Sequence, residues 1–285
     1  MKAPINHSGW KRVLLLIIPW LLSIVVFGIL GRLVIGKLVA EANFDTLSSL
    51  EMLLLQFSDM LGTFLVLWLF MRYLDKEDFI NLGFHTKNKF TEFSCGILIG
   101  FSIIAGAYVV LYFLGDIVFN NINIDITEII ISILLFALVA VVEESLCRGY
   151  VLKNLMISFN PYLALALSSI LFTIIHAANP NVDVIGFVNI FLAGIFLGIS
   201  YIYTKNLWFP IALHFSWNLF QTFFGFNVSG SATFSIIEFT IPKNNILNGG
   251  ENGFEGSILC TIVMIIMIFI VNNYYKQLRL NSSLD

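Results

Sequence analysis

The chain has 285 residues, of which 58% are hydrophobic and only 12% are charged. Soluble domains carry about a quarter charged residues, so this composition excludes an ordinary soluble protein and predicts an integral membrane protein. The net charge of -3 is small, and we expect no nucleic-acid partner.

Apolar stretches that could cross a bilayer predict an all-α, polytopic membrane protein with about eight spanning helices in one domain, residues 1–285. The first stretch has 19 residues and ends without a cleavage pattern, so we expect a retained span and no secretory signal. The predicted spans are 13–31, 52–71, 93–115, 129–142 with a continuation past it, 161–178, 184–204, 206–226 and 256–271.

Lys and Arg are distributed unevenly between the two sets of loops. With both termini in the cytoplasm of a multi-pass cell-membrane protein, twelve basic residues face inside and three face outside, as the positive-inside rule requires. The inside set is Lys2, Lys11, Arg12, Arg72, Lys76, Lys87, Lys89, Arg148, Lys153, Lys205, Lys276 and Arg279. We expect the long Gly-, Asn- and Ser-rich segment 227–255 to be an outside loop.

Two adjacent glutamates and an arginine interrupt the fourth apolar stretch, in the sequence VVEESLCRGY. The fourteen uncharged residues before Glu143 rise only about 21 Å, short of a bilayer core of about 30 Å, so the helix should continue past the charges. The alternative is a span that ends at Val142, with the charges among lipid headgroups. Glu144 and Arg148 are four residues apart and should pair on one helix face, whereas Glu143 points about 100° away. Charged residues within a span usually line functional cavities.

Two of the four histidines lie within predicted spans, beside other residues at helical spacing. His176 follows Phe172 by one turn, and His214 precedes Asn218 by one turn. A proline lies four residues before the second histidine, and we expect Pro210 to kink that helix. A lone buried histidine is usually a core residue, but these spacings favour a functional site.

Helix arithmetic tests whether these residues can meet. If the chain turns near residues 158–161, Glu143 and His176 both lie about 22 Å from the turn, whereas His214 lies about 12 Å deep and needs a tilted helix to reach them. Together they could activate water by general-base catalysis, or bind a zinc ion whose water attacks. Both chemistries lead to hydrolysis of an acyl bond. Neither a G-x-S-x-G nor an HExxH motif is present.

The order EExxxR, FxxxH and HxxxN on successive predicted spans resembles the signature of the CAAX protease and bacteriocin-processing family (CPBP, or Abi). These are intramembrane endopeptidases related to the type II CAAX prenyl endopeptidase. The resemblance covers residues 125–226, which we expect to form the catalytic core. The candidate catalytic residues that it implies are Glu143, Glu144, Arg148, His176, His214 and Asn218.

The resemblance also implies roles. Glu143 would act with His176 on water, and His214 with Asn218 would bind the oxyanion, while the ion-paired glutamate and arginine orient and neutralise the site. The family is often classed as metalloproteases, in which case the two histidines and Glu143 would bind zinc, but a metal-free mechanism has also been argued, and the few ligands favour the metal-free one slightly. The expected partner is a peptide or membrane-protein substrate within the lipid bilayer; the sequence predicts neither its identity nor an oligomeric state.

Two other functions compete with proteolysis. A membrane immunity or binding protein could use the same fold without hydrolysis, although a pure binder would not need all six residues. A proton-coupled transporter could also use buried Glu and His, but no inverted repeat is visible.

Several smaller features carry their own expectations. Asp59, in the second predicted span, could face the cavity or make a structural contact, with equal weight. Gly194 and Gly198 form a GxxxG pattern that predicts close helix packing within the chain in preference to a dimer interface. We expect the three cysteines to be small buried side chains; they are Cys95, Cys147 and Cys260.

Overall fold

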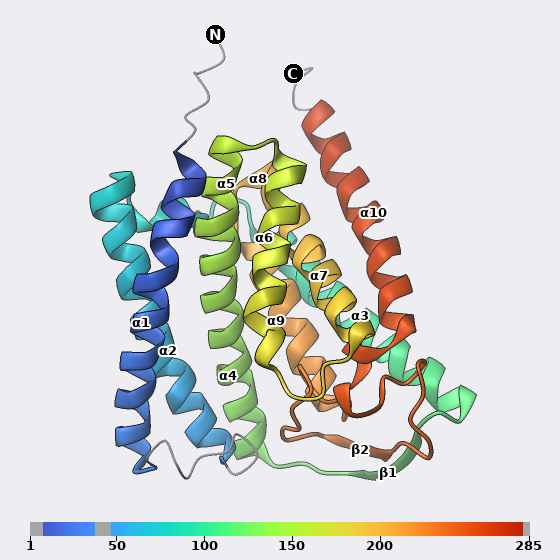
Figure 1. Ribbon diagram of the computed structural model, residues 1–285. Coiled ribbons are helices and arrows are strands. Elements are labelled where there is room, and N and C mark those ends of the chain that lie inside the picture. The colour runs from blue at the N-terminus through green and yellow to red at the C-terminus, as the bar shows by residue number, and fades with distance from the viewer. Residues whose placement is uncertain (1–7, 38–46, 282–285) are drawn as a thin grey trace.

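Long apolar helices make up most of the chain (Figure 1). The structure is a computed structural model that describes residues 8–37 and 47–281. The α-helices are α1 Gly9–Ile35, α2 Ser49–Leu69, α3 Phe90–Leu114, α4 Ile126–Glu144, α5 Lys153–Ser158, α6 Pro161–Ile175, α7 Val184–Ile199, α8 Tyr201–Thr204, α9 Trp208–Phe223 and α10 Ile258–Asn281. Short π-helices cover Phe70–Asp75 and Ser145–Leu152, and 3₁₀ turns cover Phe79–Leu82, His176–Ala178, Gly250–Asn252 and Phe254–Gly256.

Within the described residues, 6 helices are long and apolar enough to cross a membrane. The predicted count of about eight is not confirmed, because two of the predicted spans form shorter helices. The helix α6 has 15 residues and α9 has 16, which rise about 22 and 24 Å against a bilayer core of about 30 Å. Twelve side chains of α9 are buried, so protein surrounds this short helix on most sides.

The fourth predicted span continues through its charges, as expected. The helix α4 runs into the π-helix Ser145–Leu152 and then into α5, which together form one rod over Ile126–Ser158. The alternative placed the charges among lipid headgroups, but Glu144 and Arg148 are buried inside the protein. The sequence did not predict that the charged segment is π-helical, a conformation that is rare and concentrates at functional sites.

The ends of the bundle separate the predicted inside and outside segments. The helices α1 and α10 begin and end, respectively, at the upper end of the bundle in Figure 1, where α2 ends and α5 turns into α6. The lower end holds both strands and the segment before α10. Assigning the upper end to the cytoplasm stays a prediction from the basic residues. One of these, Lys2, lies outside the described residues.

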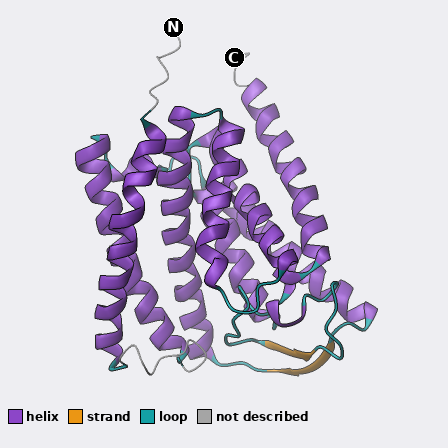
Figure 2. Ribbon diagram, in the orientation of Figure 1, coloured by secondary structure: helices purple, strands orange, loops and turns teal. Residues whose placement is uncertain are grey.

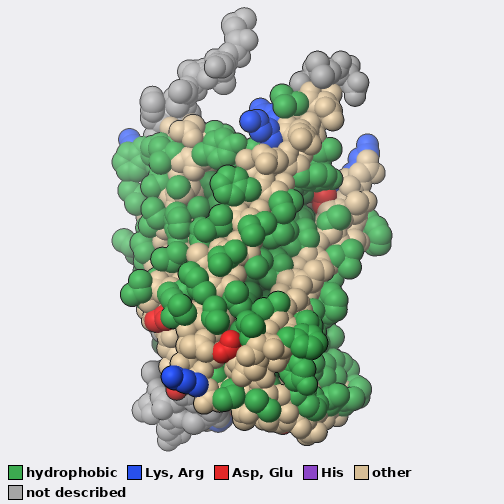
Figure 3. Space-filling view, turned by 90° about the vertical axis from the view of Figure 1, so that its right-hand side faces the viewer, with side chains coloured by type: hydrophobic (Ala, Val, Ile, Leu, Met, Phe, Trp, Pro, Cys, Tyr) green, Lys and Arg blue, Asp and Glu red, His purple; other side chains and the backbone are tan. Residues whose placement is uncertain are grey.

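The outer surface of the bundle fits a lipid environment. In Figure 3, hydrophobic side chains cover most of one face, and Lys and Arg lie near its two ends. Large apolar side chains such as Ile18 and Val34 of α1 are 68% and 75% exposed, which would be unfavourable in water. Together with the six long apolar helices, this surface identifies a multi-pass membrane protein.

A two-stranded sheet at the lower end is missing from the all-α prediction (Figure 2). The strand β1 (Val118–Ile122) pairs antiparallel with β2 (Ile237–Thr240), with an irregularity between Phe119 and Asn121. The pairing joins the start of α4 to the long segment after α9. It therefore holds that segment against the bundle.

Glycines set the distance between the central helices. A Cβ at Gly194 of α7 would lie 2.7 Å from the Cβ of Ser169 in α6, and one at Gly198 would lie 2.5 Å from Leu165. The prediction that this GxxxG pattern packs within the chain is confirmed. Similarly, a Cβ at Gly100 of α3 would lie 2.0 Å from the Ser216 hydroxyl, so α9 can approach α3 closely only because this position is glycine.

The remaining expectations have mixed outcomes. Asp59 does not line the cavity described below and interacts electrostatically with Arg32 of α1, which favours the structural role. All three cysteines are free, and Cys147 and Cys260 are buried as predicted. The prediction is wrong for Cys95, which is exposed on α3. A thiol is apolar enough for a surface that faces lipid.

Candidate active site

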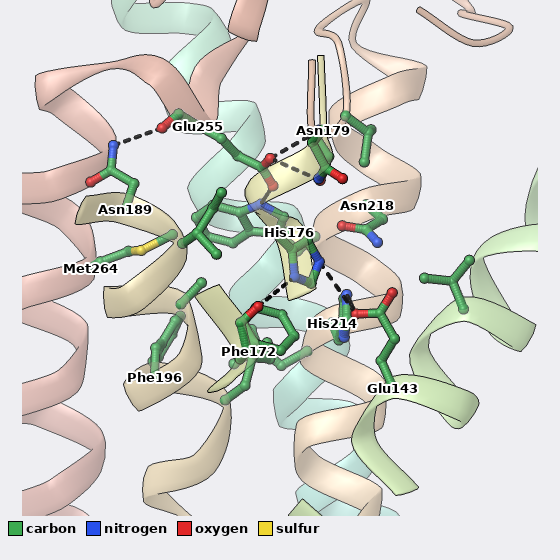
Figure 4. A pocket seen from close by; sticks show the side chains of 18 of the residues that line it. Glu143, Phe172, His176, Asn179, Asn189, Phe196, His214, Asn218, Glu255 and Met264 are labelled. Carbon is green, nitrogen blue, oxygen red and sulfur yellow. Dashed lines mark hydrogen bonds and ion pairs between the residues drawn. The ribbon is translucent and has the colours of Figure 1, made fainter. Parts of the chain in front are cut away.

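A cavity of about 260 Å³ lies between α4, α6, α7, α9 and α10. Glu143 reaches it from the end of α4, and His176 from the 3₁₀ turn after α6 (Figure 4). His214 and Asn218 reach it from α9, one turn apart. Four of the six predicted catalytic residues thus line one cavity, although three segments of the chain supply them. Glu144 and Arg148 are not in this lining but are fully buried behind it.

Glu144 and Arg148 form the ion pair that their spacing predicted. The guanidinium Nη1 donates to Glu144 Oε1 over 3.0 Å, and Nη2 donates to the main-chain oxygen of Gly194 over 3.0 Å. The guanidinium also lies over the ring of Phe172, 4.5 Å from its centre. Its carboxylate, carbonyl and aromatic partners explain how an arginine that is 1% exposed is tolerated among apolar helices.

The same carboxylate holds one of the histidines. His214 Nδ1 lies 2.9 Å from Glu144 Oε1, and because a carboxylate can only accept, Nδ1 carries the hydrogen. This fixes the ring so that Nε2 points towards the cavity, 4.0 Å from Glu143 Oε2. The arrangement is a carboxylate–histidine pair whose outer partner is the buried arginine.

The second histidine is fixed by main chain. His176 Nδ1 donates to the carbonyl oxygen of Phe172 over 2.8 Å, the contact that the FxxxH spacing makes within one helical turn. Its Nε2 lies 3.6 Å from Glu143 Oε2, and the Phe172 ring packs 4.3 Å from the imidazole. The predicted equal depth of Glu143 and His176 is therefore confirmed.

Three potential acceptor atoms converge at the centre of the site. They are Glu143 Oε2 and the Nε2 atoms of the two histidines, whose Nδ1 atoms both carry hydrogens. Glu143 Oε2 is buried and has no hydrogen-bond partner among the described residues. Such a cluster can accept both hydrogens of a water molecule and hold its oxygen in one place.

Glu143, His176 and His214, the ligands expected only if a zinc ion is used, stay a prediction. Among the described residues, no group of three or more His, Cys, Asp or Glu side chains is arranged to hold a metal ion. Oε2 of Glu143 lies 3.6 Å from Nε2 of His176 and 4.0 Å from Nε2 of His214. We therefore derive no step of the reaction through a metal.

The carboxamide of Asn218 is the neutral hydrogen-bonding group of the predicted set. The side chain is buried, lines the cavity, and has no hydrogen bond to another described residue. Its amide hydrogens can therefore be donated to a bound molecule. The predicted kink at Pro210 is wrong: α9 begins at Trp208, so the proline lies in the first turn, where its missing N–H costs no helical hydrogen bond.

A third carboxylate in the cavity escaped the sequence analysis. Glu255, from the turn just before α10, lines the cavity, and each of its oxygens accepts a hydrogen bond. Trp217 Nε1 donates to Oε1 over 3.1 Å, and the main-chain N–H of Ser229 donates to Oε2 over 3.0 Å. Burial raises the pKa of the Glu255 carboxyl, and these two hydrogen bonds act in the opposite direction. No local spacing distinguishes this glutamate from a residue that merely precedes a helix.

The segment between α9 and α10 is a loop, as predicted, but it forms one wall of the site. Asn189 of α7 donates from Nδ2 to the main-chain oxygens of Glu255 and Ser257, over 2.7 and 2.9 Å. Thr261 of α10 donates to the other end of the same carboxamide over 2.6 Å. These bonds hold the Glu255 turn against the bundle, a contact that the prediction of an outside loop did not include.

Among known protein families, one has a model that matches residues 125–220 of this chain. This part of the chain matches the family model described as "Rce1-like: Type II CAAX prenyl endopeptidase Rce1-like". No curated protein and no solved structure matches the chain. The matched part contains all six predicted catalytic residues. The resemblance that the three motifs indicate is thereby confirmed: residues 125–220 are similar to the Rce1-like type II CAAX prenyl endopeptidase model.

Proposed function

We propose that this chain is an intramembrane endopeptidase that hydrolyses a peptide bond in a peptide or membrane protein delivered through the bilayer. The observation that carries the proposal is the convergence of Glu143, His176, His214 and Asn218 on one cavity. A carboxylate, two oriented imidazoles and a carboxamide are sufficient for general-base hydrolysis. We also propose that both termini lie in the cytoplasm.

Glu143 and His176 activate the attacking water. Oε2 of Glu143 removes a proton while the Nε2 atom of His176 accepts the other hydrogen of the water. The water oxygen then bonds to the carbonyl carbon, and the carbonyl oxygen becomes the oxyanion. As the C–N bond breaks, the carboxyl of Glu143 returns its proton to the leaving nitrogen, which regenerates the carboxylate.

His214 and Asn218 stabilise the oxyanion. The amide of Asn218 donates one hydrogen bond, and His214 can donate a second from Nε2 when its ring is protonated. The buried Glu144 carboxylate 2.9 Å from Nδ1 stabilises that positive charge. Arg148 pairs with the same carboxylate, so the charges of the site nearly balance.

The cavity walls favour an apolar substrate residue beside the cleaved bond. Aromatic side chains of four helices line it, namely Phe136, Phe172, Phe196 and Trp217. Aromatic walls hold apolar side chains and exclude competing water. The Ile-, Phe- and Asn-rich composition suggests an AT-rich bacterial genome, so we propose a small peptide or a membrane-bound partner as substrate in preference to a prenylated protein.

Mass spectrometry of peptides from the membranes of growing cells tests the proposed function. Cells that express the chain should accumulate peptide fragments that cells expressing Glu143→Gln lack, and growth in H₂¹⁸O should label the new C-terminal carboxylates. Mass spectrometry of membrane extracts measures both. The function is wrong if equal amounts of both proteins reach the membrane and no fragment distinguishes them.

Replacing Asn218 by alanine should lower kcat by about 10²–10³-fold and change KM little, because the lost hydrogen bond strengthens only as the oxyanion forms. The measurement is steady-state cleavage of a peptide identified by the fragment analysis. Gln221 of the same helix is buried outside the cavity lining, so Gln221→Asn controls for disturbance of α9. Equal losses in the two variants would contradict a role for Asn218 in the transition state.

A further inference from the structure

Glu255 gives the cavity a second carboxyl group. It lies outside the Rce1-like residues 125–220 and outside the three motifs. It reaches the cavity because hydrogen bonds from Asn189 fasten its turn to α7. Its side chain lines the same cavity as His176 and His214, so a molecule bound at those residues shares the cavity with its carboxylate. Figure 4 shows Glu255 and Glu143 on different sides of His176.

The charges around the cavity favour a positive ligand. The described lining residues include the carboxylates Glu143 and Glu255 and two histidines, but neither Lys nor Arg. The nearest arginine in the network, Arg148, is held by Glu144, by a carbonyl oxygen and by the Phe172 ring. A cationic group that enters the cavity therefore meets no fixed positive charge in its lining.

The carboxylate of Glu255 is positioned but not saturated. Trp217 donates to Oε1, and both the main-chain N–H and the hydroxyl of Ser229 donate to Oε2, which fixes the orientation of the carboxylate. A carboxylate oxygen can accept about two hydrogen bonds, so Oε1 can still accept one from a ligand. Trp217 lies against the carboxylate, and the same cavity is lined by apolar side chains such as Ile190 and Met264. An aliphatic stem that ends in an ammonium or guanidinium group matches this combination of apolar wall and charged end.

We propose that Glu255 is a specificity-determining residue that selects a substrate cation, most simply a lysine or arginine side chain, within a few positions of the cleaved bond. This inference rests on the proposed peptidase function. The same chemistry would bind the free amino terminus of a short peptide, and the experiment separates the two sources.

The test uses internally quenched peptides that share one apolar sequence, with lysine, glutamine or glutamate placed at one position at a time. Each peptide is made with a free and with an acetylated amino terminus. For the wild-type protein in detergent, lysine at one position should give a kcat/KM about ten-fold above glutamine, and glutamate should give a lower value. A preference that appears only with the free terminus, whatever the side chain, would assign Glu255 to the terminal amine and overturn the side-chain preference.

Two variants separate charge selection from structural support. Glu255→Gln should bring the lysine-to-glutamine ratio of kcat/KM to about one. Glu251→Gln, an equal charge change at an exposed position of the same loop, should leave the ratio unchanged. If Glu255 only fastens the loop, its variant lowers cleavage of all peptides alike and the ratio survives, which would overturn the inference.

Two further outcomes are decisive without any variant. Cleavage by the wild type with no lysine preference at any position would overturn the inference alone, and the peptidase function would stand. The folded wild-type protein could also cleave no peptide of the set and release no fragment in the membrane analysis. That result would overturn both this inference and the proposed peptidase function.

Discussion

Replacing Glu143 by glutamine should lower kcat by about 10²–10⁴-fold and leave the folded protein intact. Glutamine has nearly the same shape but cannot remove a proton from water, and general-base catalysis contributes about 10²–10⁴-fold. The side chain is 29% exposed, and its Oε2 has no hydrogen-bond partner among the described residues, so removing its charge breaks no structural hydrogen bond of that atom. Single-turnover cleavage and thermal unfolding in detergent measure the two effects.

A matched substitution on the same helix controls for the loss of one negative charge. Glu128 lies in the first turn of α4, about 22 Å from Glu143 along the helix, and Glu128→Gln should retain nearly full activity. If the Glu143 variant keeps more than a tenth of the wild-type kcat, another group activates the water, and the proposed role of Glu143 is wrong.

Replacing Arg148 by methionine should lower the free energy of unfolding by about 3–5 kcal/mol, the cost of leaving one partner of a buried ion pair without its countercharge. The substitution strands the Glu144 carboxylate, which is 0% exposed, and removes the donor that satisfies the carbonyl oxygen of Gly194. Methionine fills much of the same volume, so the loss measures charge and hydrogen bonding more than packing. Denaturation in mixed detergent micelles measures it.

The double variant Glu144→Gln/Arg148→Met should recover part of that loss, because no unpaired charge stays buried. The double-mutant cycle should then give a coupling energy of more than about 1 kcal/mol. Lys153→Met, which breaks the more exposed pair with Glu77 one turn beyond the site, should cost at most about 1 kcal/mol. Additive effects at Glu144 and Arg148 would mean that the pair does not act as a unit.

Much of the candidate site was predictable because two of the three motifs encode a contact within one helical turn. Four-residue spacing on a helix brings side chains together, so Glu144 meets Arg148 and His176 meets the Phe172 carbonyl whatever the rest of the fold does. The apolar stretches likewise follow from the cost of exposing polar groups to lipid. These two local rules, with the family resemblance, predict most of the site.

Contacts between distant segments were not predictable in the same way. The predicted depth of His214 assumed that the turns before α6 and α9 lie at the same height in the membrane. The structure nevertheless brings Nε2 of His214 within 4.0 Å of Glu143 Oε2. The sheet of β1 and β2 joins segments that flank the whole catalytic region, and neither strand shows a long alternating pattern. Glu255 depends on the same tertiary arrangement, because its donors come from α9 and from a residue 26 positions away.

The π-helical stretch Ser145–Leu152 has a consequence for how α5 is oriented. A π-helical turn contains one more residue than an α-helical turn, so it behaves as a local insertion that the flanking helix absorbs. If the same residues wound as an ordinary α-helix, everything downstream would rotate by about 100°, carrying Asn154 away from Arg12 of α1. The winding of this stretch therefore sets which face of α5 meets α1 and keeps Glu143 turned towards the cavity on the other side of it.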